Sequence, residues 1–181
     1  MVRVSWLGRG GGEVWLVEAV REQVERLFAV RTERHSSADW PASAYDQRRS
    51  QLSSTHILAW MVSELPADGS KALALTDVDL FIPILSFVFG EAQLRGRAAV
   101  VSTARLRDPA GGTHAPLLAA RLVKEAAHEL GHTFGLLHCE RPQCAMSRST
   151  NLADVDRKGA ELCRDCRVRL ADLRREEVLH A

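Results

Sequence analysis

The sequence has 181 residues, with 24 Lys and Arg against 23 Asp and Glu, so its formal charge at pH 7 is +1. This length suits one α/β domain with a sizeable core. The near-zero charge gives no indication of a nucleic-acid or membrane-surface partner, and no apolar run approaches the ~20 residues of a membrane span. We therefore expect a monomer that binds neither nucleic acid nor membranes.

The N-terminal residues do not resemble a secretion signal. Residues 2–7 form a short apolar run that ends in the glycine-rich stretch 8–12. This segment lacks the apolar core and cleavage site of a signal peptide, so we expect a cytoplasmic protein. We also expect a buried strand over residues 2–7. A plain turn should follow, because the glycines do not have the spacing of a nucleotide-binding loop.

Predicted strands and helices alternate along the next hundred residues. Apolar residues recur at helical spacing over residues 13–28, and a second helix is expected over residues 51–65. The other elements expected here are strands over residues 29–34, 71–76, 84–91 and 98–106, with loops over residues 36–49 and 107–114. This order predicts a mixed sheet with right-handed crossovers.

A third long helix, expected over residues 116–134, ends in a cluster of metal-binding side chains. His128 and His132 are four residues apart, so they share one face of the helix and can bind the same ion. Glu129 follows the first ligand and can reach a water molecule on that ion. Gly135 can adopt the positive φ that ends the helix, which lets His138 return as a third ligand. Three histidines leave the fourth position of a tetrahedral zinc open, as catalytic sites do.

The shorter pattern His-Glu-x-x-His also occurs in helices that merely place two histidines at a polar edge. That alternative does not explain why Gly135 and His138 fall at ligand spacing. The extended pattern is the metzincin signature, so the sequence favours a catalytic zinc site.

All four cysteines lie in the last quarter of the chain: Cys139, Cys144, Cys163 and Cys166. In a reducing compartment, clustered thiols favour a metal over disulfides. The last two form a Cys-x-x-Cys pair that suits a zinc knuckle, and the first two complete a closed tetrahedral set. A redox dithiol is the alternative, but it leaves the first two cysteines unexplained. In the same region Asn151 is expected to cap a brief helix, and a charged amphipathic helix is expected over residues 167–179.

The order of these residues resembles one known family. The matching positions are His128, Glu129, His132, Gly135, His138, Cys139, Cys144, Met146, Cys163 and Cys166. Their order resembles the archaemetzincins, which are zinc-dependent metallopeptidases of the metzincin clan. Residues 44–51, 76–80, 87–92 and 105–106 resemble further segments of that family, so the likeness covers most of the chain.

The resemblance implies two Zn²⁺ per chain, one catalytic and held by the three histidines, and one structural and held by the four cysteines. It implies that Glu129 is the general base of peptide-bond hydrolysis by a zinc-activated water, and that Met146 forms a turn beneath the first metal. One position departs from the pattern. Several metzincins place a tyrosine zinc ligand two residues after this methionine, and Arg148 stands there in this chain.

The implied fold is α/β (α+β), a metzincin-like zincin with a mixed twisted sheet and packed helices. Residues 1–135 would form an upper subdomain that ends in the active-site helix, and residues 136–181 a lower one with the methionine turn and the cysteine site. A peptide or protein substrate would lie between them, paired with the edge strand of the sheet. The resemblance places this edge at Phe87, Val88, Phe89, Gly90 and Glu91. An ordinary core strand is the alternative for this segment.

Three functions are consistent with the sequence, and a zinc metallopeptidase is favoured. A catalytically weak zinc protein that binds peptides is the second, and Glu129 argues against it. A zinc-ribbon interaction module is the third. The near-neutral charge and the absence of interleaved aromatic residues disfavour it.

Overall fold

The computed structural model describes residues 1–8, 13–36, 38–109 and 111–179. Its main sheet has five strands in the order β2-β1-β5-β9-β8. In that order they span Thr32–Arg34, Val2–Leu7, Lys71–Thr76, Ala98–Ser102 and Gly90–Ala92. The first four pair in parallel, whereas β8 runs antiparallel to β9. Strand β8 is therefore one edge of this sheet.

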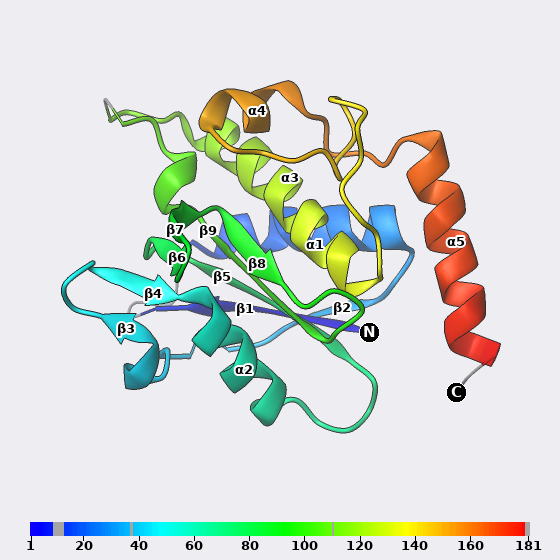
Figure 1. Ribbon diagram of the computed structural model, residues 1–181, viewed down its shortest axis with the longest axis horizontal. Helices are drawn as coiled ribbons and strands as arrows, with labels where there is room; N and C mark the ends of the chain where they lie inside the picture. Colours follow the sequence, from blue (N-terminus) through cyan, green and yellow to red (C-terminus); the bar gives the residue numbers. More distant parts are fainter. Residues whose placement is uncertain (9–12, 37, 110, 180–181) are drawn as a thin grey trace.

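Helices cover both faces of the main sheet (Figure 1). Helices α1 (Val14–Phe28) and α3 (Ala115–Thr133) pack on one face, and α2 (Ser54–Glu64) packs on the other. In β5, Leu73 and Leu75 face α1 and α3, while Ala72 and Ala74 face α2. Side chains alternate between the two faces of a strand, so a strand covered on both sides is apolar along its length. The α/β fold class that the sequence predicted is confirmed.

A second, smaller sheet has the order β3-β4-β6-β7. Its strands span Tyr45–Asp46, Gln51–Ser53, Leu80–Ile82 and Leu85–Val88. The sequence-based prediction of one strand over residues 84–91 was wrong, because β7 belongs to this sheet and β8 to the main one. The predicted helix over residues 51–65 begins three residues late. Ser53 caps it by accepting a hydrogen bond from the His56 N–H, and residues 51–53 form β4 instead.

Other predicted elements lie close to their expected positions. Strands β1 and β5 have the predicted bounds, and α3 begins and ends one residue before its predicted limits. The predicted strand over residues 98–106 stops at Ser102 and is followed by a 3-10 turn, Ala104–Leu106. The loop predicted over residues 36–49 contains β3 and a second 3-10 turn, Ala42–Ala44. The turn predicted over residues 8–12 lies mostly outside the described residues.

Two helices follow the last strand. Helix α4 (Leu152–Arg157) begins after Asn151, whose side chain accepts a hydrogen bond from the Asp154 N–H as predicted. Helix α5 (Arg164–Leu179) begins three residues before its predicted start and so contains Cys166. Figure 1 shows α4 beside α3 and α5 at the end of the molecule where α3 terminates. Within the described ranges, no helix is both long enough and apolar enough to cross a bilayer.

Candidate metal centre and active site

Helix α3 presents two of the three predicted histidine ligands and then ends sharply. Gly135 adopts φ +91°, a conformation that glycine takes without steric cost. Its N–H donates to the carbonyl of His132 (2.9 Å), and the N–H of Leu136 donates to Gly131 (3.0 Å). These bonds satisfy carbonyls at the helix end and reverse the chain. The reversal brings His138 back toward the helix.

The three histidines converge. One ring nitrogen each of His128, His132 and His138 lies within 4.8 Å of the other two. The Nε2 atoms of His128 and His132 are 3.2 Å apart. This donor set fits zinc, because three neutral imidazoles bind one tetrahedral ion and leave its fourth position open.

Backbone carbonyls orient two of the three rings. The Nδ1 of His128 donates to Ala145 O at 2.9 Å, and the Nδ1 of His132 donates to Leu136 O at 2.7 Å. A proton fixed on Nδ1 leaves Nε2 free for a metal. Burial lowers the pKa of His128, His132 and His138, which also favours the neutral ligand form. The Nδ1 of His138 lies 3.3 Å from the guanidinium of Arg148.

The predicted base, Glu129, is only 8% exposed on the same helix. Burial raises its pKa to about 8, and repulsion from Glu125 adds to the rise, while the positive charge of Lys158 opposes it. A cation bound by the histidines would favour the carboxylate form in the same direction as Lys158. In these surroundings the Glu129 carboxylate can accept a proton near neutral pH, as a general base must.

Two glycines make room for this site. A Cβ at residue 90 would lie 2.6 Å from the Cγ of Glu129 and 2.7 Å from the carbonyl oxygen of Val100. Strand β8 thus passes against Glu129, and only glycine allows this approach. A Cβ at Gly131 would overlap the sulfur of Met146, which is fully buried. Met146 therefore packs on the backbone of α3 between the first two histidines.

The four cysteines also converge, with their sulfur atoms within 4.8 Å of one another. The N–H of Cys163 donates to the sulfur of Cys144 (3.3 Å), and that of Arg141 to the sulfur of Cys139 (3.5 Å). Backbone N–H groups directed at thiolates stabilise their charge in metal sites. A set of four close thiols fits a tetrahedral structural zinc better than a single redox pair.

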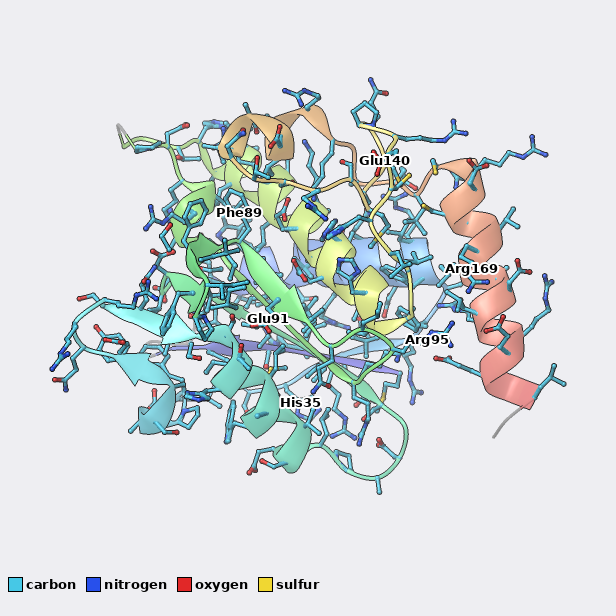
Figure 2. All side chains as sticks on the ribbon, in the orientation of Figure 1. His35, Phe89, Glu91, Arg95, Glu140 and Arg169 are labelled. Atoms are coloured by element: carbon cyan, nitrogen blue, oxygen red, sulfur yellow. The ribbon has the colours of Figure 1, made fainter. Side chains whose placement is uncertain are left out.

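The segment predicted to bind substrate is divided between the two sheets. Phe87 and Val88 belong to β7, while Gly90 and Glu91 belong to β8. Phe89 is buried against the α1 and α3 side of the core. The Glu91 carboxylate accepts hydrogen bonds from two hydroxyls at the start of α2. Phe89 immediately precedes β8 and Glu91 is its central residue; both are labelled in Figure 2. Only part of the predicted segment therefore forms the sheet edge near Glu129.

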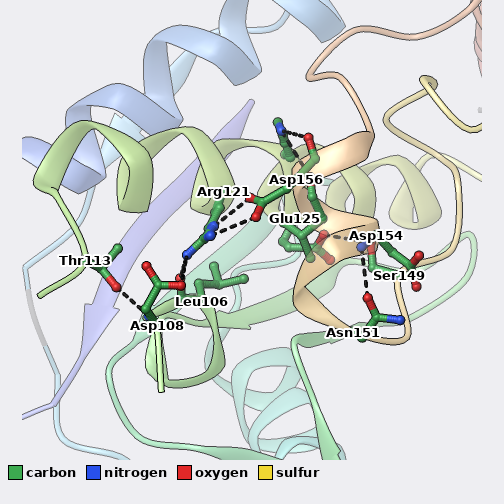
Figure 3. Close-up of polar contacts among 11 residues, drawn as sticks. Leu106, Asp108, Thr113, Arg121, Glu125, Ser149, Asn151, Asp154 and Asp156 are labelled. Carbon is green, nitrogen blue, oxygen red and sulfur yellow. Dashed lines mark hydrogen bonds and ion pairs between the residues drawn. The ribbon is translucent and has the colours of Figure 1, made fainter. Parts of the chain in front are cut away.

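Charged residues before the histidines attach α3 to the C-terminal region, and sequence reasoning missed them. Arg121 forms two hydrogen bonds with Asp156 of α4 (2.7 and 2.8 Å), and Glu125 accepts one from Ser149 (3.1 Å; Figure 3). Glu125 also pairs with Lys158, described below. Arg121 and Glu125 precede His128 by seven and three residues, so all three lie on one face of the helix. That spacing was a signal available in the sequence.

Comparison with known proteins gives the family. The model of peptidase family M54 matches residues 11–172. The chain belongs to peptidase family M54. The archaemetzincin of Methanopyrus kandleri is 40% identical over 151 residues, which is 83% of each chain. That of Methanocaldococcus jannaschii is 43% identical over 136 residues, or 74% of each.

The crystal structure of the Methanopyrus kandleri archaemetzincin superposes on this M54 chain with a TM-score of 0.84 at 36% sequence identity. The superposition covers 97% of this chain and 96% of the other. Family membership and this structural match confirm the resemblance noted in the sequence, and with it a zinc-dependent metallopeptidase.

Proposed function

We propose that His128, His132 and His138 hold one catalytic zinc ion, that the four cysteines hold a second, structural one, and that Glu129 is the general base of peptide hydrolysis. The observation that carries the proposal is the convergence of three ring nitrogens within 4.8 Å beside a buried carboxylate. Met146 and Gly135 support this arrangement, the first by packing under the histidines and the second by turning the chain.

Each side chain has a defined part in the proposed mechanism. Zinc, when bound, would supply Lewis-acid chemistry: it would polarise the scissile carbonyl and lower the pKa of water, which makes water a better nucleophile near neutral pH. Glu129 takes the proton of the attacking water and later delivers it to the leaving amine. Ala145 and Leu136 keep the two helix histidines in the required tautomer. The buried surroundings of Glu129 keep its carboxyl group away from bulk water.

The proposed substrate is a peptide or protein that lies between residues 1–135 and 136–181, which we propose as the two subdomains. Strand β8 offers it a free edge. The backbone of Phe89 and Gln93 bonds to β9, and in an antiparallel pair the intervening Gly90 and Ala92 direct their N–H and C=O groups outward. An extended peptide can add to such an edge without strong demands on its sequence.

A hollow beside His138 provides room for part of the substrate. Its volume is about 570 Å³, and its lining includes the exposed side chains of Leu94 and Leu137. Arg95 and Arg169 border it on the side of α5 (Figure 2). An apolar wall next to a metal ligand suits a substrate side chain close to the scissile bond.

Proline at residue 92 tests the role of the edge. Ala92→Pro removes an outward N–H without removing a bond to β9, so the sheet should tolerate it. We expect KM for peptide substrates to rise several-fold while zinc content stays constant, as measured by steady-state kinetics and metal analysis. Ala92→Gly keeps the N–H and should raise KM far less. Equal KM values for the proline variant and the unaltered chain would exclude β8 as the binding edge.

Gly90→Ala tests the approach of β8 to the base. The added Cβ cannot displace the Val100 carbonyl without disturbing β9, so either Glu129 or β8 must move. Displacement of a catalytic group by about 1 Å lowers turnover about 10²-fold, and we expect kcat to fall by that order. Gly69→Ala is the control: its φ of +72° makes alanine lower the stability, but nothing lies within 4 Å of its Cβ position, so the change displaces no neighbour and kcat should be unaltered. Full activity of Gly90→Ala would show that this contact does not constrain the base.

The proposed function is tested by zinc content per chain and by cleavage of a fluorogenic peptide library with and without a chelator. We expect two zinc ions per chain and cleavage that stops on chelation and returns with zinc. Zinc without cleavage would favour the peptide-binding alternative. Zinc at the cysteines alone would favour the interaction module.

A further inference from the structure

A fully buried ion pair lies one helical turn before the first histidine. The Nζ of Lys158 is 2.8 Å from the Oε1 of Glu125, and the two side chains are 0% and 3% exposed. Withdrawing both charges from water is costly, and apolar side chains of similar size would often give equal or greater stability. Stability alone therefore gives no reason for this pair.

Both members of the pair bind the segment that follows the methionine. Lys158 donates to the backbone oxygen of Ser147 (3.4 Å), and the hydroxyl of Ser149 donates to Glu125 Oε1 (3.1 Å). The pair thus holds residues 147 and 149 at once, on either side of Arg148. A charged partner strengthens a hydrogen bond, and the bond from Ser149 to the Glu125 carboxylate is the shorter of the two.

The segment held in this way carries the groups that orient the metal ligands. Ala145 accepts the hydrogen bond from His128, and Met146 packs against Gly131 of α3. Ser147 comes directly after these two residues. A shift of residues 147–149 would therefore move the carbonyl that fixes the tautomer and orientation of His128.

We propose that Lys158 and Glu125 are positioning residues of the histidine site: their buried ion pair fixes residues 145–149 against α3 so that Ala145 orients His128 for the metal. This inference rests on the proposed function, because it takes the histidines as zinc ligands.

The decisive variant removes both charges. Replacing the pair by apolar residues in K158M/E125L leaves no unpaired buried charge, so its free energy of unfolding should stay close to that of the unaltered chain. The bonds to Ser147 and Ser149 are nevertheless lost. Loss of a group that orients a metal ligand typically weakens metal binding about 10- to 100-fold, and we expect this loss at the histidine site. The single variant K158M should show the same loss of affinity together with lower stability.

Arg121→Met is the matched control. Arg121 is a second buried cation on the same face of α3, one turn further from the histidines, and it also pairs with the C-terminal region. It contacts neither Ser147 nor Ser149 in the hydrogen bonds described. We expect R121M to lower the free energy of unfolding but to retain the zinc affinity of the histidine site.

The measurement is a cobalt and zinc competition titration of the apo chain, accompanied by denaturant unfolding and by kcat at saturating zinc. Cobalt at the cysteines gives intense thiolate charge-transfer absorption that cobalt at the histidines lacks, so the two sites are followed separately. A weakened histidine site in K158M/E125L with normal stability would support the inference. Unaltered affinity in that variant, or an equal loss in R121M, would overturn it. An unaltered chain that takes up no metal at its histidines would instead overturn the proposed function.

Discussion

Glu129→Ala is expected to retain both proposed zinc ions and to lose turnover. General acid-base catalysis contributes about 10²–10⁴-fold, and we expect kcat to fall by that factor while KM changes little. Metal content should be unaffected, because the three ring nitrogens converge without any contribution from the carboxylate. Steady-state kinetics on a peptide substrate and metal analysis of the same preparation measure the two quantities together.

Glu22→Ala is the control for this substitution. Glu22 lies on α1 with an exposed side chain, so the change removes a helical carboxylate that is not part of the histidine cluster. Its kcat should equal that of the unaltered chain. Substantial peptide cleavage by Glu129→Ala would remove the proposed base, whereas loss of zinc in that variant would show that the residue acts in metal binding instead.

Cys163→Ser is expected to release the structural zinc and to loosen the catalytic one. Cys139 directly follows His138, and its N–H donates to the Met146 carbonyl (2.9 Å), so the cysteine site and the histidine site share one loop. Structural zinc contributes about 10 kcal/mol or more to the folding of small zinc peptides. We expect a lower unfolding temperature and weaker zinc affinity at the histidines, measured by calorimetry and competition titration.

Arg164→Ser provides the comparison, because residue 164 is the exposed neighbour of Cys163 at the start of α5. Both metal affinities should stay unchanged in that variant. If Cys163→Ser keeps full affinity at the histidines despite losing the other zinc, the two centres are independent, and the shared loop holds its shape without the second metal.

The convergence of the three histidines and of the four cysteines could be predicted from the sequence because their geometry is local. A four-residue helical spacing places His128 and His132 together, and one glycine with positive φ is enough to return His138. The cysteine site likewise joins two short-range pairs. Such arrangements depend on backbone periodicity and turn chemistry, both of which are properties of neighbouring residues.

The sheet edges and the burial of Lys158 could not be predicted in this way. Residues 84–91 form a mostly apolar run in which the change of sheet at Phe89 is not marked by proline or a turn dipeptide. Lys158 lies in a polar stretch, where a lysine normally indicates an exposed surface. It is buried where it pairs with Glu125 of α3, and that contact joins residues 33 positions apart in the chain. Contacts between distant parts of the chain determine both the change of sheet at Phe89 and the burial of Lys158.

The order of elements along the chain has a consequence for how the protein matures. Each strand that the structure describes ends by Ser102, whereas the proposed ligands all lie between His128 and Cys166. During translation, all of these strands are therefore synthesised before any of the proposed ligands. Metal uptake at the proposed ligands therefore cannot precede the synthesis of these strands.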